Sequence, residues 1–486
     1  MLPIRLSTRP LSLVAMLLVA ACATPPVKGL APGDVPKSFA GPVDTGAPVW
    51  PRPGWWSAFR SAELNDLVAE AAARNLDIAD AATQIAQADA AARIAGTAFL
   101  PSGDVGVTGT HTGNGISNTQ TKWDFSGLLS VSYELDVWGK NRASFDAARL
   151  SARASRYNRE TVALTTTASV ATGYFQVLSL RDQIRITKAD LAAAEKVLAL
   201  VEAQAAAGAA SPLDVAQQRA QVAGQRAALP GLEEQEREAL AALAILLGKP
   251  PQGFNVRSTT LSGLAAPVVK PGLPSELLTR RPDVKQAETA LAAAHRDVDS
   301  ARAARFPSLT LTGTAGNQSA ALETLMQGSN TLYNGGFALV APLFDQPRLK
   351  ATQDQAAAVE DQYMVAYRSA VINAFSDVHV ALGQVSALRK QESLYATQVK
   401  EAETAFNLAQ AQYTAGAIDL MTVLDTQRTL FTARDSLSQA RLSRLQSVVS
   451  LYKALGGGWQ AEDIDAVKPA ISAASAPAAP VGTTAK

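Results

Sequence analysis

Cysteine and histidine are scarce in this sequence and its net charge is close to zero. Each of these features excludes a class of protein. The single cysteine, Cys22, leaves no partner for an internal disulfide. The three histidines, at positions 111, 295 and 379, lack the spacing of metal ligands, so we expect no metal site and no cofactor. A net charge of +1 predicts no basic face for nucleic acid. The chain has no G-x-x-x-x-G-K-[ST] loop, so it is not expected to hydrolyse a nucleotide.

The first residues have the pattern of a bacterial secretion signal. Arg5 and Arg9 precede a short apolar run over 11–20, and small residues lead to Cys22. This end resembles a bacterial lipobox, which predicts a signal peptide over 1–21 and a covalent lipid on Cys22. The alternative is a chance cysteine in a discarded signal. Beyond it, no stretch of 18 uncharged apolar residues occurs, so no transmembrane helix is expected.

The two halves of the chain share residues at a spacing of 206 to 208 positions, which indicates an internal duplication. The shared residues include Arg74 and Arg280, Asp77 and Asp283, Pro101 and Pro307, Arg142 and Arg348, Gly208 and Gly416, Val215 and Val423, and Gly248 and Gly456. Chance could repeat alanines, but not these spaced residues in one order. We expect structural repeats over 61–266 and 267–458. An extended tether over 22–60 and a disordered tail over 459–486 are expected to flank them.

Each repeat is predicted to hold a first helix, two strands, one very long helix, a turn and a second long helix. The first helices are expected at about 61–98 and 275–305. The chain then runs for about 68 residues without proline after Gly139, and again over 348–415. At 1.5 Å per residue, each such helix would be about 100 Å long. The turns are predicted at Gly208 and Gly416, a returning helix at about 420–455, and a kink at Pro230.

The second long helix carries a heptad pattern. Positions 364 to 413 and 367 to 409, each taken in steps of seven, give fifteen seam positions. Fourteen of these are apolar or the size of alanine, and only Glu392 departs from the pattern. A repeat held over seven heptads predicts a coiled coil.

The strand before Gly139 alternates between an apolar and a polar side. Ser130, Ser132, Glu134 and Asp136 alternate with Val131, Tyr133, Leu135 and Val137. Alternation alone fits either a half-buried periplasmic sheet or a membrane strand whose polar side faces a wet lumen. Strands in a bilayer must close, and the smallest closed barrels have eight strands. A chain offering four strands would therefore have to share its barrel with other copies.

Several short motifs resemble the TolC-type outer-membrane efflux proteins, in the lipoprotein branch that serves resistance-nodulation-division pumps. They are Trp56-x-x-Phe59, Phe306-Pro307-Ser308, Leu135-x-x-Trp138-Gly139, Pro342-Leu343-Phe344-Asp345, and Leu424-Asp425-x-Gln427-Arg428 after Gly416. The resemblance implies a homotrimer with a 12-stranded barrel and a 12-helix periplasmic tunnel. It also implies a periplasmic adaptor and an inner-membrane pump as partners, and export of drugs or other toxic compounds across the outer membrane.

The resemblance further implies a gate at the periplasmic tip of the tunnel. A polar contact between Asp214 and Tyr413 would lock it, and Met421, Asp425 and Arg428 would line the constriction. Three copies of Asp425 would form an anionic ring that favours cations. The alternatives are a surface ion pair between Asp425 and Arg428, and a plain packing role for Tyr413, which lies on the heptad seam.

Three other functions would fit parts of this sequence. Ser376, Asp377 and His379 could suggest an enzyme, but they lie inside the predicted coiled coil, where such spacing is routine, so no enzyme is expected. A lipid-anchored periplasmic scaffold would share the coiled coil without spanning the membrane. A conduit for type I protein secretion would share the whole architecture.

Overall fold

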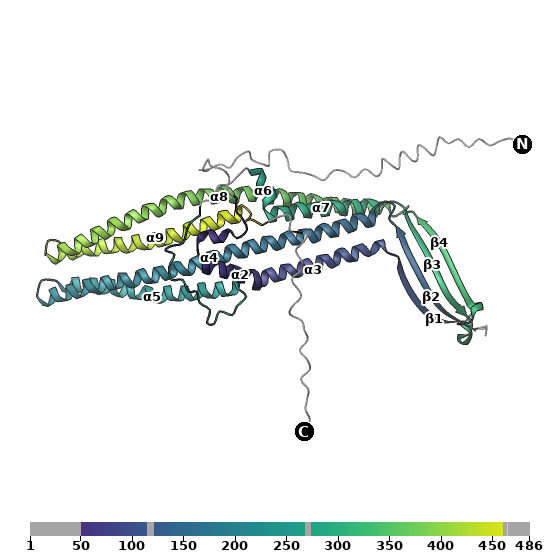
Figure 1. Cartoon of the computed structure of the whole chain (residues 1–486), viewed down its shortest axis with the longest axis horizontal. Helices are drawn as coiled ribbons and strands as arrows, with labels where there is room; N and C mark the ends of the chain where they lie inside the picture. Colours follow the sequence, from purple (N-terminus) through teal and green to yellow (C-terminus); the bar gives the residue numbers. More distant parts are fainter. Residues whose placement is uncertain (1–49, 114–120, 268–273, 460–463, 465–486) are drawn as a thin grey trace, which may run out of the picture. The chain divides into compact units, whose positions relative to one another are not determined.

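The computed structural model describes residues 50–113, 121–267, 274–459 and 464 (Figure 1). Cys22 and the predicted signal peptide lie outside these residues, as do most of the predicted tether and most of the predicted tail. No helix in the described ranges is both long enough and apolar enough to cross a membrane. The chain divides into two compact units, each assembled from separate stretches of sequence.

The first unit is drawn from residues 84–155 and 286–368 and holds a four-stranded antiparallel sheet. Its strands are β1 (Ser102–Gly113), β2 (Thr121–Leu135), β3 (Ser308–Ser319) and β4 (Thr331–Val340), which lie side by side in sequence order (Figure 1). The unit also takes in α7 (Pro282–Ala303) from Gln286 on, the later part of α3 (Leu76–Gly96), and the first parts of α4 (Lys140–Ala206) and α8 (Gln346–Thr414). Strand β3 is followed by the short 3-10 helices η3 (Leu322–Thr324) and η4 (Gly328–Asn330).

The register of the sheet gives it one apolar and one polar face. Partners directly opposite each other share a face. Val131 pairs with Gly103 and Gly313, and Leu311 pairs with Tyr133 and Phe337, so odd-numbered residues of all four strands share one side. The apolar face, as this side is called below, includes Val105, Val107, Trp123, Phe125, Leu129, Val131, Tyr133, Leu309, Leu311, Tyr333, Phe337 and Leu339. The polar face, on the even-numbered side, includes Ser102, Asp104, Thr108, Thr110, Thr112, Asp124, Ser126, Ser130, Ser132, Glu134, Ser308, Thr310, Thr312, Thr314, Gln318 and Asn334.

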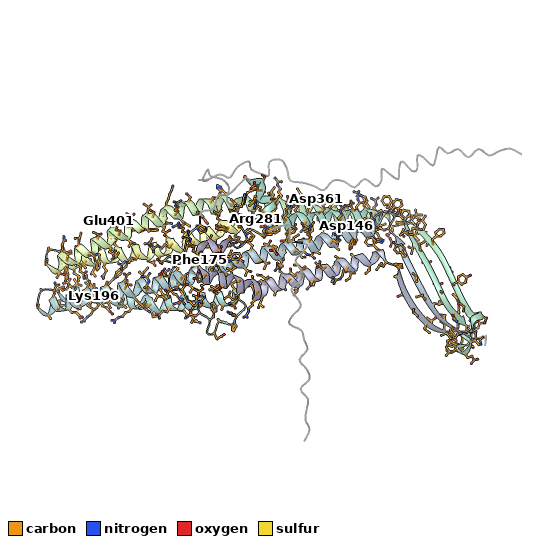
Figure 2. The ribbon with its side chains drawn as sticks, viewed as in Figure 1. Asp146, Phe175, Lys196, Arg281, Asp361 and Glu401 are labelled. Carbon is orange, nitrogen blue, oxygen red and sulfur yellow. The ribbon has the colours of Figure 1, made fainter. Side chains whose placement is uncertain are left out.

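Both faces of the sheet are open in the described chain. Val105, Val107 and Phe337 on the apolar face are each 77% exposed, and side chains project from both sides of the strands (Figure 2). The outer edges of β1 and β4 are unpaired within the described residues. An antiparallel sheet usually buries its apolar side against a core, so this face must be covered by something other than the described chain.

The second unit is helical and has a closely packed core. It holds α2 (Ala62–Arg74), α5 (Pro212–Leu246), α6 (Pro274–Arg280), α9 (Leu420–Ala454) and the remaining parts of α4 and α8. Tyr174 and Phe175, both fully buried, lie at the centre of one cluster (Figure 2 labels Phe175). The short 3-10 helix η1 (Trp55–Phe59) joins this cluster, and Trp55 stacks on Tyr452 with ring centroids 4.8 Å apart. The end of the range predicted as an extended tether is thus part of a folded core.

Each predicted first helix is divided in two. Helix α2 ends at Arg74 and α3 begins at Leu76, while α6 ends at Arg280 and α7 begins at Pro282. The side-chain Oδ1 of Asn75 accepts a hydrogen bond from the Ile78 amide at 3.0 Å, which caps α3. Pro282 favours a new start because proline suits the first turn of a helix and disfavours the helical conformation just before it.

The two long hairpins match the prediction closely. Helices α4 and α8 contain 67 and 69 residues, and α5 and α9 contain 35 each. Gly208 and Gly416 follow the long helices with φ of 75° and 71°, values that favour glycine. Helix α5 begins with a reciprocal capping box between Ser211 and Asp214, and it continues through Pro230.

The heptad seam predicted for α8 is confirmed by burial. All fifteen seam positions are buried or half-buried, although much of α8 is exposed. The exception to the apolar pattern, Glu392, accepts a hydrogen bond from Arg444 of α9 at 2.6 Å and lies 3.5 Å from Arg441. A carboxylate is tolerated on the seam because the returning helix supplies its countercharges.

Candidate functional site

The polar face of the sheet carries three of the four residues predicted to face a lumen. Ser130, Ser132 and Glu134 lie on it in alternate positions of β2. Cross-strand hydrogen bonds join other polar-face residues, with Thr108 and Ser126 hydroxyls 2.7 Å apart and Gln318 donating to Asp124 at 2.7 Å. Glu134 forms an ion pair with Lys140 at 2.6 Å. The face is therefore largely polar, although the row Gly106, Leu128, Gly316 and Leu332 crosses it without a polar side chain.

The fourth predicted residue, Asp136, lies beyond the end of the strand. Strand β2 stops at Leu135, so the alternation does not extend to Asp136. Its carboxylate accepts hydrogen bonds from the backbone amides of Asn141 at 3.0 Å and Arg142 at 2.8 Å. These are amides of the first turn of α4, where a negative charge is favourable. Asp136 holds the start of the long helix, a role that strand periodicity did not predict.

The hairpin tips bring Asp214 and Tyr413 close together. Tyr413 is 7% exposed and packs with Val197, Val201 and Val423. Burial, and then the nearby Asp214 carboxylate, raise the pKa of Tyr413 above its usual value. Within the described residues Asp214 accepts its hydrogen bonds from the Ser211 amide and hydroxyl, both at 2.8 Å. The two side chains are neighbours, and the predicted lock between them stays a prediction.

The three other gate candidates lie on the exposed first turns of α9. Met421 is 57% exposed. Arg428 donates to Asp425 at 2.5 Å, and their side chains are 75% and 64% exposed. In a single chain, Asp425 and Arg428 form a surface ion pair, which is the alternative to a gate that the sequence left open. A pore-lining role for these residues requires further copies of the chain, so it also stays a prediction.

One of the residues that could have suggested an enzyme, Asp377, has a partner in the helical unit. Asp377 accepts a hydrogen bond from Arg281 at 2.9 Å, which engages it in the packing of the helical unit. Among the described residues no group of three or more histidine, cysteine or acidic side chains is placed to hold a metal ion.

A charged link between the two hairpins was not predicted. Arg434 of α9 donates to Asp190 of α4 at 2.6 Å and to Glu403 of α8 at 2.8 Å. Asp190 is 3% exposed, and burial raises its pKa although the hydrogen bond from Arg434 opposes this. The heptad pattern concerned one helix only, whereas this link depends on the pairing of three helices.

An exposed sheet with one apolar face, joined in sequence to two hairpins of very long helices, defines a class of membrane-channel protein. The model of the outer membrane efflux protein family matches residues 67–249 and 273–457, one match for each repeat. The chain belongs to this family, as its motifs had indicated. It is an outer-membrane component of efflux, and the family is one of channels rather than of enzymes.

Individual relatives agree with this assignment. The pyoverdine export outer membrane protein OpmQ of Pseudomonas aeruginosa is 42% identical, over 94% of this chain and 98% of that protein. The "Probable outer membrane lipoprotein SilC" of Salmonella typhimurium is 28% identical, over 92% and 98%. The open state of the MtrE outer membrane channel of Neisseria gonorrhoeae superposes with a TM-score of 0.82 at 27% identity, over 90% of this chain and 98% of that one.

Proposed function

We propose that three copies of this chain form a passive, gated conduit through the outer membrane. The observation that carries the proposal is the sheet, which exposes an apolar face, a polar face and two edges that no described residue pairs with. In hydrocarbon every backbone group needs a partner, so β1 of one copy must pair with β4 of the next. Twelve strands then close a barrel whose apolar face meets lipid and whose polar face encloses water.

The covalent lipid on Cys22 would add a second attachment to the same membrane. The relative SilC supports this part of the proposal, since its name describes an outer membrane lipoprotein. Each buried CH₂ of an acyl chain contributes roughly 0.8 kcal/mol, so several chains anchor a protein firmly. The Cys22→Ala variant, once purified, should lack the mass of the lipid in a mass spectrum. Its barrel should still insert into the membrane.

The hairpin tips would form the periplasmic gate and the docking end for partners. Asp214 and Tyr413 would hold the tip closed, while Met421, Asp425 and Arg428 of three copies would surround the narrowest opening. A periplasmic adaptor and an inner-membrane resistance-nodulation-division pump would supply cargo and energy, and the chain itself would catalyse no reaction. The cargo would be a small molecule; the relative OpmQ is named for the export of pyoverdine.

Single-channel recording in planar bilayers tests the conduit and the gate together. Wild-type protein should give discrete openings, and Asp425→Ala should raise their conductance and weaken any preference for cations. The matched control is Asp435→Ala, an exposed acid about ten residues further along α9. Openings equal in all three proteins would move the gate away from Asp425. Silence from monomeric wild-type protein would reject the conduit and favour a lipid-anchored periplasmic scaffold.

A further inference from the structure

A small charged pocket lies in the first unit, where the strands give way to helices. Its volume is about 180 Å³. Its polar wall consists of Arg142 and Asp146 of α4 with Arg296, Asp299 and Arg302 of α7. Trp138 and Phe306, stacked with ring centroids 5.0 Å apart, form its apolar wall. The function proposed above uses none of these side chains.

Asp299 lines this pocket and carries a buried oxygen without a hydrogen-bond partner among the described residues. The residue is 9% exposed, and its Oδ2 accepts a hydrogen bond from Arg296 at 3.0 Å. Its Oδ1 is buried and accepts no hydrogen bond from any described residue. Buried carboxylate oxygens normally have partners, so this atom calls for an N–H or O–H donor from a ligand. The described residues offer too few acidic or histidine ligands here for a metal ion.

The opposite part of the pocket suits an anion. The backbone amide of Arg142 donates a hydrogen bond to Asp136. The guanidinium group of Arg142 forms no ion pair among the described residues. Arg302 lines the same pocket. Guanidinium groups bind phosphate through paired, charge-assisted hydrogen bonds. The pocket thus offers sites for a phosphate and for a nitrogen donor close together.

The pocket also lies at the depth of one membrane surface if the apolar face spans the bilayer. Trp138 follows the end of β2 by three residues, and Phe306 precedes the start of β3 by two. Aromatic residues are enriched at this level, and the polar headgroup layer occupies roughly 5 to 8 Å on each side of the hydrocarbon. A ligand bound here would be at headgroup depth.

We propose that this pocket binds the headgroup of a phosphoethanolamine lipid. The phosphate would contact Arg142 and Arg302, and the ammonium group would donate to Oδ1 of Asp299 and to Asp146. The stacked Trp138 and Phe306 would cover the carbon atoms of the headgroup. A lipid bound here would tie α4 to α7 at the base of the sheet. The proposal rests on the proposed membrane-spanning function.

Native mass spectrometry of the full-length trimer, loaded with equal amounts of two lipids, tests the proposal. Phosphatidylethanolamine should be retained about tenfold over phosphatidylcholine, because a choline group has no N–H to donate to Asp299. Asp299→Asn should abolish this preference, and Arg142→Ala should reduce retention of both lipids. Arg93→Ala, which removes an exposed arginine of α3 outside the pocket, should leave both unchanged.

Other results would overturn the proposal. Equal retention of the two lipids by wild-type protein would reject recognition of the amine. Retention of phosphatidylglycerol as strong as that of phosphatidylethanolamine would show that the site recognises phosphate alone. Release of the bound lipid by excess inorganic phosphate would show the same. Conductance recorded on the same preparations separates the two ideas. Channels that open without any lipid preference would reject the pocket and keep the conduit, whereas preparations that never open would reject the conduit itself.

Discussion

The two repeats solve one structural problem with different side chains. Helix α5 ends at Leu246 and α9 ends at Ala454, and the carbonyl of each last residue needs a donor. In the first repeat the Asn75 side chain donates to the Leu246 carbonyl at 2.9 Å. In the second, the equivalent Arg281 donates to the Ala454 carbonyl at 3.2 Å. The position is repeated although the residue is not.

The difference lies in what each donor brings with it. The amide of Asn75 is neutral and needs no countercharge. Arg281 has a side chain only 10% exposed, and it forms ion pairs with Asp283 at 2.6 Å and Asp377 at 2.9 Å (Figure 2 labels Arg281). A buried guanidinium is stable only with such partners. The fold therefore requires a donor at this point of each repeat, while the choice of donor determines how much charge must be arranged around it.

The largest expected effect comes from the glycines that follow the same helix ends. A Cβ on Gly248 would lie 2.3 Å from the carbonyl oxygen of Arg74, and one on Gly456 would lie 2.3 Å from that of Arg280. Both glycines also have positive φ, at 64° and 90°. Gly248→Ala and Gly456→Ala should each destabilise the fold by about 5 kcal/mol, since backbone strain and a backbone clash add. Thermal unfolding of the purified variants measures the loss.

Gly253→Ala is the matched control for these two variants. Gly253 has φ of 75°, but an added Cβ would meet nothing within 4 Å. It should cost only the conformational strain, about 1 to 2 kcal/mol. If Gly248→Ala were no more harmful than Gly253→Ala, the close approach to Arg74 would not be a constraint. If only one repeat proved sensitive, the two helix ends would not be equivalent.

The second prediction separates the two donors. Arg281→Ala should cost about 3 kcal/mol, because it leaves the Ala454 carbonyl and two carboxylates without their partner. Asn75→Ala should cost about 1 to 2 kcal/mol, for one lost hydrogen bond and one lost helix cap. Thermal unfolding of these two variants, and of a third variant, Arg281→Asn, tests whether the charge of Arg281 explains the difference. An asparagine that restored full stability at position 281 would mean that the carboxylates do not depend on Arg281.

The sequence predicted the features that repeat along one element. The heptads predicted the coiled coil of α8, and the proline-free runs predicted the lengths of α4 and α8. The turns were predicted from Gly208 and Gly416. It did not predict the helix breaks at Asn75 and Arg281, because the reason for them lies in α5 and α9, far along the chain. The same holds for Asp136, whose role depends on where β2 stops. Pairwise contacts between distant elements leave no periodic trace in one sequence.

The smallest predicted effect is a difference in pH dependence between the repeats. Glu63 fastens the segment after α5, accepting from the Arg257 amide at 2.5 Å, the Ser258 amide at 2.9 Å and the Tyr174 hydroxyl at 3.2 Å. Burial alone would raise the pKa of Glu63, but hydrogen bonds from these three residues lower it below the usual 4.5.

A carboxylate whose pKa is lower in the folded state stabilises the protein above its unfolded pKa, and this contribution is lost as the pH falls through the folded value. Glu63→Gln should therefore cost about 1 to 2 kcal/mol at neutral pH, and the difference from wild type should shrink below pH 4.5. In the second repeat, burial lowers the pKa of Arg281, but hydrogen bonds from Arg281 to Asp283 and Asp377 raise it overall, so this group stays charged throughout. Melting temperatures of wild type and Glu63→Gln from pH 7 to pH 3.5 measure the effect. A difference that stayed constant with pH would mean that the charge of Glu63 does not contribute to stability. Any acid sensitivity of the first repeat would then have to arise from other residues.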